Sequence, residues 1–263
     1  MQPIYWHKQT KAEPLFGDML WSRPENRQFA GKLLIVGGNA HGFAAPADAY
    51  GESVRAGIGT SRVLLPDVLQ KTVGKVFEAG EFAPSNPSGG FAQNGLGELL
   101  AMAEWADGVL FAGDFGRNSE TAILLEKFLE KYTGPLTITK DATDYFTSSP
   151  RQVIERTETT LVLSFAQLQK LAMNAKFTKA FTFDIDLLRL VDSLHEFTAQ
   201  HAVNIVTKHL DTIFVAANGQ VSSTKLEDDL AIWRVKVAAQ TAVWWLQNTA
   251  KTFEALTTAI AAL

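Results

Sequence analysis

Glycines gather directly after an apolar run near the N-terminus, in the stretch LLIVGGNAHGF at residues 33–43. Gly37 and Gly38 follow this run, and Gly42 comes four positions after Gly38. The pattern predicts a buried strand that ends in a loop whose backbone a ligand can approach closely. In open α/β sheets, ligands bind beyond the carboxyl ends of the strands, which is where this loop would lie. A tight turn without any ligand is the alternative explanation of the same glycines.

Two further stretches place polar groups at the end of an expected strand. In FAGDFGRNSE, residues 111–120, a glycine-rich turn leads into a helix that Asn118 or Ser119 could cap, and its first N–H groups would favour an anion. In TKHLDTIFVAANGQ, residues 207–220, Lys208 stands at a strand end, where it could meet a phosphate. An ordinary turn explains the first stretch about as well, and a solvated surface lysine is the simpler explanation of the second.

Other chemistry is excluded or unsupported by the residues. The chain has no cysteine, which excludes disulfides, thiolate zinc sites and cysteine nucleophiles. Neither GxxxxGK[ST] nor GxSxG occurs, and the adjacent Gly37 and Gly38 do not form GxGxxG. The five histidines lack metal-binding spacing, although His41 lies inside the first glycine loop. No metal site is therefore predicted.

Composition limits the classes of protein. A chain of 263 residues suits one large domain, or at most two small ones. A net charge of -4 argues against a broad nucleic-acid surface. No run reaches the roughly 18 apolar residues of a membrane helix, and the N-terminus lacks the layout of a signal peptide. We therefore expect a soluble, cytoplasmic protein with a small-molecule ligand, no nucleic-acid or membrane partner, and scope for a homo-oligomer.

The elements that would position these groups alternate along the chain. Short apolar runs predict strands at residues 32–37, 61–66, 108–113, 136–139, 160–164, 204–207 and 212–217. Helical patterns cover residues 46–57, 94–106, 119–132, 165–174 and 184–200, and a long segment from about Asp228 to the end. The Asn-Gly pair within residues 216–220 predicts a hairpin near the C-terminal edge of the sheet, and residues 82–95 predict a surface loop. The alternation predicts an α/β fold with a mostly parallel sheet and helices on both faces.

The order of the motifs resembles the ADP/ATP-dependent NAD(P)H-hydrate dehydratase family, a branch of the ribokinase-like fold. The resemblance covers roughly residues 23–263 and leaves 1–22 as an N-terminal extension of a single domain. Four stretches carry it, GKLLIVGGNAHGFAAPADAYGESVRAGIG, ADGVLFAGDFGRNSE, LTITKDATDYF and TKHLDTIFVAANG, and the C-terminal FEALTTAIAAL also resembles the family's last helix. They are similar to the family's opening glycine loop and to its ADALVIGPGLGR, LVLDADALNLL and LKGA.TVI..PDG segments. The resemblance implies a three-layer α/β/α sandwich.

The resemblance also implies an activity and a set of site residues. In that family a hydrated nicotinamide dinucleotide is phosphorylated at the expense of a nucleotide, and phosphate is then eliminated. ATP or ADP with Mg²⁺ would be the cofactor. The matching positions on the substrate side are Gly37, Gly38, Asn39, His41, Gly42, Phe43, Gly113, Asp114, Gly116 and Arg117. Those on the nucleotide side are Lys208 and Thr212, and Arg234, which lies where the family has a different motif, could bind an anion through its guanidinium instead.

The chain departs from the family where phosphoryl transfer takes place. The family's GTGD motif, which supplies an anion hole and a catalytic base, falls at IWRV, residues 232–235, and no glycine follows Gly219. Four other positions of the family's motifs carry a different residue in this chain. Asp114 stands in place of a proline, Thr139 of an aspartate, Ser164 of a histidine and Gln167 of a glutamate. The remaining candidates for a catalytic base are Asp141, Asp228 and Asp229.

Three hypotheses follow from these matches and departures. The first is an active NAD(P)H-hydrate dehydratase or small-molecule kinase with a replacement base. The second is a relative that binds a nucleotide or similar metabolite without turnover. The third is an interaction protein in which Trp233, Trp244 and Trp245 pack against another chain, since aromatic residues are enriched both at interfaces and in cores.

Overall fold

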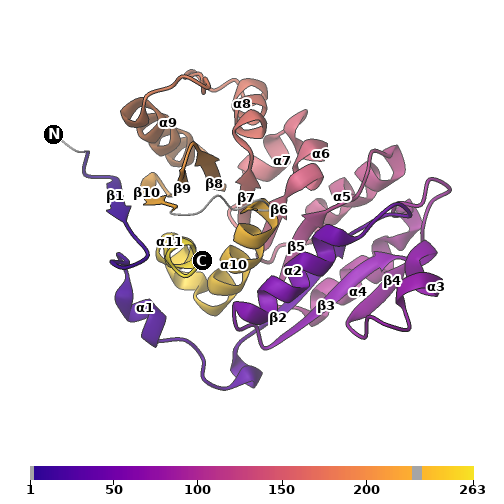
Figure 1. Cartoon of the computed structure of the whole chain (residues 1–263). Coiled ribbons are helices and arrows are strands. Elements are labelled where there is room, and N and C mark those ends of the chain that lie inside the picture. The colour runs from indigo at the N-terminus through magenta and orange to yellow at the C-terminus, as the bar shows by residue number, and fades with distance from the viewer. Residues whose placement is uncertain (1–2, 227–232) are drawn as a thin grey trace.

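A single mixed sheet runs through the computed structural model, which describes residues 3–226 and 233–263. Its strand order within those residues is β1-β10-β9-β8-β7-β6-β5-β2-β3-β4 (Figure 1). The strands are β1 (Trp6–Gln9), β2 (Lys32–Gly37), β3 (Thr60–Pro66), β4 (Gly80–Ala83), β5 (Gly108–Gly113), β6 (Leu136–Thr139), β7 (Thr159–Leu163), β8 (Asn204–His209), β9 (Thr212–Ala217) and β10 (Gln220–Lys225). From β4 to β8 all neighbours are parallel, whereas β9 is antiparallel to both β8 and β10.

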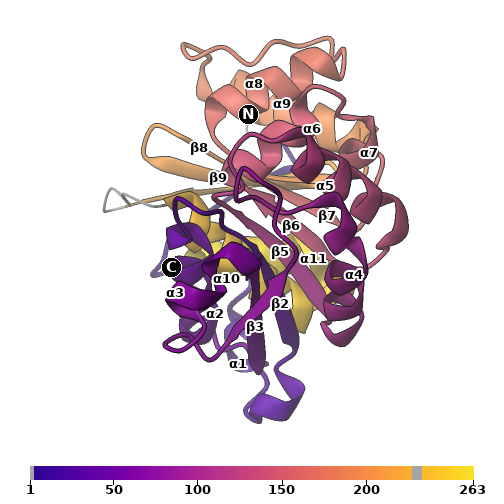
Figure 2. The same ribbon diagram turned by 90° about the vertical axis from the view of Figure 1, so that its right-hand side faces the viewer.

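Helices cover both faces of the sheet. They are α1 (Gly17–Trp21), α2 (Ala44–Arg55), α3 (Gln70–Val73), α4 (Leu96–Trp105), α5 (Ser119–Lys131), α6 (Asp144–Thr147), α7 (Arg151–Ile154), α8 (Phe165–Asn174), α9 (Leu187–Gln200), α10 (Trp233–Gln247) and α11 (Thr252–Ala261). The helices α2, α10 and α11 lie on one face, and α4, α5, α8 and α9 lie on the other (Figure 2). The result is a three-layer α/β/α sandwich.

The two cores arise from the alternation of side chains along each buried strand. In β2, Leu34 and Val36 join the core under α4 and α5, whereas Leu33 and Ile35 join the core under α2 and α10. β5 divides in the same way, since Phe111 faces the first core and its neighbours face the second. Strands with apolar groups on both faces must lie in the middle of a sandwich, as the unbroken apolar runs predict.

The predicted strands form in the predicted places. Four of them have the same bounds as predicted, namely β2, β5, β6 and β9. The hairpin is also confirmed, because Asn218 and Gly219 join β9 to β10 with φ values of 50° and 73°. Two consecutive positive φ angles are the mark of the tight hairpin turn that an Asn-Gly pair favours.

The prediction of one long helix from about Asp228 to the end is wrong in its second half. α10 ends at Gln247, and Asn248 has φ -146° and ψ 53°, which lies outside the helical region. A short 3₁₀ turn then leads into α11, which packs back on α10. The first part of that prediction, residues 227–232, lies outside the described residues.

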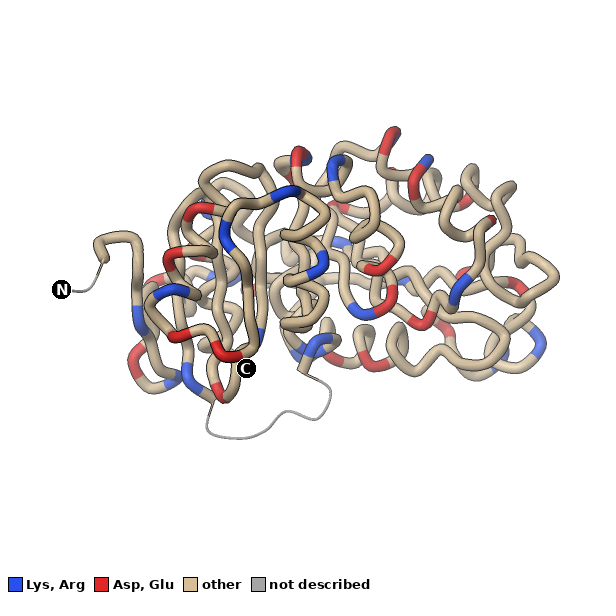
Figure 3. The backbone as a smooth tube through the Cα atoms, turned by 90° about the horizontal axis from the view of Figure 1, so that it is seen from above, with Lys and Arg blue, Asp and Glu red and all other residues tan. Residues whose placement is uncertain are grey.

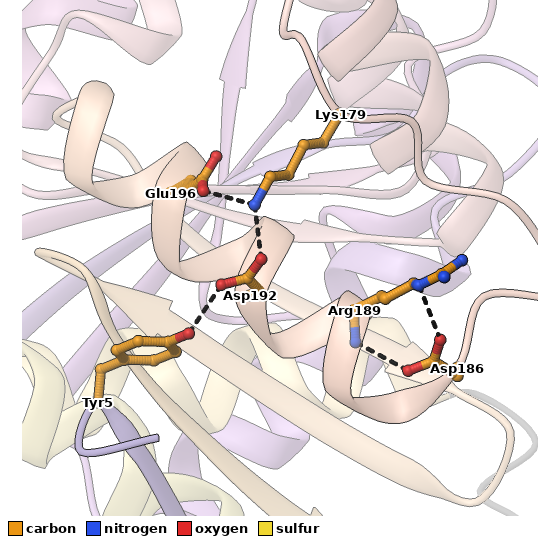
Figure 4. A network of polar contacts seen from close by, with 6 residues as sticks. All are labelled: Tyr5, Lys179, Asp186, Arg189, Asp192 and Glu196. Carbon is orange, nitrogen blue, oxygen red and sulfur yellow. Dashed lines mark hydrogen bonds and ion pairs between the residues drawn. The ribbon is translucent and has the colours of Figure 1, made fainter. Parts of the chain in front are cut away.

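The N-terminal segment contributes an edge strand. β1 pairs in parallel with β10, and the side chains of Trp6 and Gln9 are buried there. Just before β1, the Tyr5 ring stacks on His195 of α9 with ring centroids 3.7 Å apart, and its hydroxyl donates to Asp192 at 2.7 Å (Figure 4). Residues 6–9, within the predicted extension 1–22, therefore belong to the sheet.

Candidate functional site

The carboxyl ends of β5, β6 and β7 meet at one edge of the sheet, because these neighbouring strands are parallel. Asp114 follows β5, Asp141 lies in the turn after β6, and Ser164 follows β7 and caps α8. Sequence distances of about 25 residues separate these positions, and the fold brings them together through its crossovers. This edge is the candidate site.

Asp141 fixes the loop that follows β5. Its Oδ1 accepts the backbone N–H of Asp114 at 2.7 Å, and its Oδ2 accepts the backbone N–H of Gly116 at 3.0 Å. Burial raises the pKa of the Asp141 carboxyl above its usual value, while these two N–H groups oppose that rise. A carboxylate that is partly desolvated and lies at a cavity can exchange a proton with a ligand. Its two oxygens nevertheless already hold structural hydrogen bonds.

Asp114 and Lys140 form a second link between the same two strand ends. Lys140 Nζ lies 2.7 Å from Asp114 Oδ1, and Asp114 Oδ2 accepts the backbone N–H of Ala45 in the first turn of α2, also at 2.7 Å. Both residues have left-handed backbones, with φ values of 61° and 53°. Such conformations are costly for residues other than glycine and gather at functional sites. The ion pair holds both in place.

The two glycine loops approach each other. The N–H of Gly38 donates to the carbonyl of Gly113 at 3.0 Å, and a Cβ atom at Gly37 would lie only 2.3 Å from that carbonyl oxygen. Asn39 Nδ2 donates to the carbonyl of Asp114 at 2.5 Å. Packing therefore explains the glycine at position 37, because a side chain there would collide with the end of β5.

The remaining residues of the first loop lie nearer to solvent. Asn39 Oδ1 accepts the N–H of the exposed His41 at 2.7 Å, and Gly42 has nothing within 4 Å of a hypothetical Cβ atom. Phe43 precedes α2 and packs on the core that α2 covers. The structure brings Gly37, Gly38 and Asn39 against Gly113, Asp114 and Gly116, so the two loops form one unit.

Arg234 belongs to the same edge of the sheet. It lies in the first turn of α10, and its Nη1 donates to Gln167 Oε1 at 3.0 Å. Gln167 Nε2 in turn donates to Asp144 Oδ1 at 2.9 Å and to the carbonyl of Lys140 at 2.7 Å. Burial lowers the pKa of the Arg234 guanidinium, and the charges of Asp144 and Asp141 oppose that shift. The chain Arg234–Gln167–Asp144 therefore connects α10, α8 and α6.

Two predicted nucleotide-binding residues lie one strand further along the sheet, where Thr207 of β8 pairs with Leu163 of β7, directly before Ser164. Lys208 and Thr212 lie at the end of β8 and the start of β9, and β7 separates β8 from β6. Thr212 Oγ1 donates to Asp211 Oδ1 at 3.0 Å. Asp228 and Asp229 lie outside the described residues.

A cavity opens beside Asp141, between α5, α6 and α8. Its volume is about 540 Å³, and its walls are formed by Gly116, Arg117, Asn118, Ser119, Asp141, Asp144, Tyr145 and Lys170. Tyr145 braces it, because its hydroxyl donates to the carbonyl of Gly116 at 2.7 Å. A volume of this size accommodates a small organic ligand.

Sequence reasoning missed several of these residues. Three of them lie close to Asp141 in sequence but match no motif, namely Lys140, Asp144 and Tyr145. Their positions at the site depend on how the chain turns after β6. Lys170 carried one usable signal, since it stands three residues after Gln167 on a predicted helix and so shares its face.

Two further findings concern metals and membranes. Among residues 3–226 and 233–263, no group of three or more His, Cys, Asp or Glu side chains could hold a metal ion. No helix within the same ranges is long and apolar enough to cross a membrane.

Residues of opposite charge are interspersed along the chain (Figure 3).

Comparisons with known proteins identify the fold. A ribokinase-like superfamily protein from Enterococcus faecalis superposes with a TM-score of 0.75 at 14% identity, over 99% of this chain and 87% of that one. ADP/ATP-dependent NAD(P)H-hydrate dehydratase from Bacillus subtilis, co-crystallised with ATP/Mg²⁺, superposes with a TM-score of 0.62 at 12% identity, over 94% and 86%. A pyrophosphate-dependent kinase of the ribokinase family, complexed with a pyrophosphate analogue and myo-inositol, gives 0.51 at 12% identity, over 88% and 94%.

These likenesses establish the ribokinase-like fold that the motif order predicts. No protein-family model matches the sequence, and no curated protein sequence matches it either. At identities of 12–14% the superpositions identify the architecture and not the reaction.

Proposed function

We propose that this protein binds a small phosphate-bearing metabolite at the carboxyl ends of β5, β6 and β7, and that it transfers phosphoryl groups slowly or not at all. The ligand class we favour is a nucleotide or nicotinamide dinucleotide. The observation that carries the proposal is the position of Arg234, a partly buried guanidinium that donates to an uncharged amide.

Arg234 supplies the positive charge that a phosphate requires. A guanidinium has five N–H donors in a planar fork, and the contact with Gln167 uses only one of its nitrogen atoms. Within the described residues Arg234 forms no ion pair with a carboxylate. Burial makes its charge costly, as the lowered pKa indicates, and an incoming anion would relieve that cost. The site therefore favours an anionic ligand.

The same residues argue against fast phosphoryl transfer. An anion hole of the usual kind needs backbone N–H groups that approach the phosphate closely, and glycines are absent from the segment after Gly219. Gln167 carries no charge, and both oxygens of Asp141 already accept backbone N–H groups. Losing either a base or an oxyanion-type site costs several kcal/mol, or roughly a thousandfold in rate.

Mg²⁺ would reach such a site together with the nucleotide. Because the described residues offer no cluster of metal ligands, the metal would be held chiefly by phosphate oxygens and water. The Bacillus subtilis dehydratase co-crystallised with ATP/Mg²⁺ supports ATP and ADP as the first nucleotides to test. A cytoplasmic location suits this ligand class and remains part of the proposal.

The test is thermal unfolding with ATP, ADP, AMP, NAD, NADH and hydrated NADH, each with and without Mg²⁺. At a ligand concentration 100 times Kd the folded state gains about 2.7 kcal/mol, which raises Tm by roughly 5–11 °C for a chain of this size. Arg234→Gln should lose most of that shift. Arg151→Gln, which changes an exposed arginine paired with Glu155 on α7, should keep it. Equal shifts in all three proteins, or none with any compound, would refute the proposal.

Active catalysis is the second candidate, and one observation favours it. Asp228 and Asp229 are carboxylates that precede Val235, the position matching the aspartate of GTGD, by seven and six residues. The enzyme would then be an NAD(P)H-hydrate dehydratase or a small-molecule kinase. Turnover of hydrated NADH with ATP that disappears in the double variant Asp228→Asn, Asp229→Asn would support it, whereas turnover that survives would show that another group is the base.

A further inference from the structure

Gln167 lies between a cation and a carboxylate at the candidate site. It is a buried residue in the first turn of α8. Its Oε1 accepts a hydrogen bond from Arg234 Nη1 at 3.0 Å, and its Nε2 donates to Asp144 Oδ1 at 2.9 Å. Within the described residues, no carboxylate forms an ion pair with the Arg234 guanidinium. The amide is therefore inserted between two groups of opposite charge.

The surroundings of this amide fix the direction in which it points. Its NH₂ group faces the backbone carbonyl of Lys140 at 2.7 Å and the carboxylate of Asp144, and both groups accept hydrogen bonds. Its oxygen faces the guanidinium of Arg234 and the backbone N–H of Ser164 at 3.1 Å, and both groups donate. A reversed amide would place donors against donors and acceptors against acceptors. Gln167 therefore presents a neutral oxygen to Arg234.

The start of α8 does not by itself require a glutamine at this position. Ser164 and Gln167 form the capping box of α8, a motif in which glutamate serves as well as glutamine. Glutamate lacks the N–H groups that reach Lys140 and Asp144, and its negative charge would pair with Arg234. The property that only glutamine supplies here is a neutral link between Arg234 and Asp144.

A direct ion pair is what an arginine forms elsewhere when a carboxylate is within reach. Arg189 pairs with Asp186 at 3.2 Å near the start of α9 (Figure 4). Arg234 and Asp144 are also close, because the two contacts of Gln167 and the bond lengths of its amide place Nη1 within about 8.5 Å of Oδ1. A flexible arginine side chain can close a gap of this size. The amide of Gln167 therefore occupies the space in which the direct pair would form.

We propose that Gln167 is a positioning residue that holds Arg234 apart from Asp144 and so keeps the guanidinium available to an anionic ligand. The proposal rests on the proposed function and deepens it, because Arg234 is the group that would receive the ligand. Burial lowers the pKa of Arg234 and the charge of Asp144 opposes that shift, so the two groups already attract each other across the amide. Without the amide they would pair, and an incoming anion would first have to break that pair.

The test measures the dissociation constant of ATP with Mg²⁺ by isothermal titration calorimetry. Gln167→Ala should weaken binding roughly tenfold, as expected when a charge-assisted hydrogen bond to the ligand is lost. Asp144→Asn added to that variant removes the competing carboxylate and should restore most of the affinity. Gln169→Ala is the matched control, because it removes another glutamine of α8, one that donates to the carbonyl of Phe181 at 2.5 Å, and it should leave the affinity unchanged.

Gln167→Glu should lose affinity in a different way. Glutamate keeps the capping box but pairs with Arg234 itself, so ATP binding should weaken and Asp144→Asn should not restore it. A purely structural role predicts that this variant, which keeps the cap, binds ATP normally, or that Asp144→Asn fails to restore Gln167→Ala. Either result overturns the inference, and so does an unchanged affinity in Gln167→Ala. If Gln167→Ala does not fold, Gln167→Glu decides the question alone, since normal ATP binding overturns the inference and weakened binding supports it.

A ligand-free crystal structure of Gln167→Ala separates this inference from the proposed function. It should show the guanidinium of Arg234 in direct contact with the carboxylate of Asp144. If it does, and no nucleotide stabilises the wild-type protein, the positioning role stands and the nucleotide assignment fails. If Arg234 and Asp144 stay apart in that structure, the inference is overturned whether or not nucleotides bind. Thermal unfolding without ligand shows which variants are folded.

Discussion

Two glycines of the same loop should respond oppositely to substitution by alanine. A Cβ atom at Gly37 would lie 2.3 Å from the carbonyl oxygen of Gly113 and 2.9 Å from Cγ of Pro46. The first neighbour is backbone in β5, so the methyl group can be accommodated only if β2 and β5 separate at their carboxyl ends. Overpacking of this kind costs about 3 kcal/mol, the upper end of the usual range. For a chain of this size that lowers Tm by roughly 6–12 °C.

Gly42→Ala is the matched comparison. Nothing lies within 4 Å of a Cβ atom there, and the φ angle of Gly42 is not in the left-handed region. Alanine then reduces the freedom of the unfolded chain and should change stability by less than about 1 kcal/mol, in the stabilising direction. Urea unfolding of both variants measures the difference. If Gly37→Ala loses less than about 1 kcal/mol, or Gly42→Ala loses as much as Gly37→Ala, the loop-on-loop explanation of the glycines is wrong.

Two further substitutions test groups around the site and the sheet edge. Because burial raises the pKa of Asp141, its contribution to stability is largest below the ordinary aspartate pKa of about 4 and falls as pH rises through the raised value. Asp141→Asn removes that fall, so the variant should gain stability relative to the wild type between about pH 4 and pH 7, and a difference independent of pH would contradict the assigned pKa direction. Tyr5→Phe keeps the stack on His195 but loses the hydrogen bond to Asp192, and should cost about 0.5–1.5 kcal/mol in urea unfolding. An unchanged unfolding midpoint would mean that this contact does not stabilise the N-terminal strand.

The sheet was predictable from the sequence where its strands are buried on both faces. Runs such as residues 32–37 and 108–113 are apolar throughout because both neighbours in the sandwich are hydrophobic cores. β1 and β4 escaped prediction because each has only four residues and carries polar groups, WHKQ and GEFA. An edge strand buries fewer of its side chains than a central strand, so fewer of its residues need to be apolar. The helical pattern alone did not show the break after Gln247, since polar residues in a helical stretch do not by themselves show where the chain turns, although the resemblance implied a separate last helix that corresponds to α11.

The candidate site was predictable only at residues that carry a motif. The two glycine loops were predicted to line a ligand site, and their mutual contact became visible only through the register of β2 on β5. The link between Lys140 and Asp114 depends on two left-handed backbones, which no local pattern of charged residues predicts. Lys170 lies on the exposed side of an amphipathic helix, where a lysine is the most ordinary residue.

Several positions at which the chain departs from the family that it resembles have specific partners in the structure. Asp114, which replaces a proline, pairs with Lys140, and Gln167, which replaces a glutamate, accepts a hydrogen bond from Arg234 in the segment that replaces GTGD. A glutamate at position 167 would have paired with Arg234, whereas the amide accepts its hydrogen bond and leaves it without a carboxylate in direct contact. Decay of an unused site would be expected to leave scattered, unpartnered groups rather than paired changes that keep a partly buried cation in place. The connected pattern therefore favours a site remodelled for binding over a structural remnant.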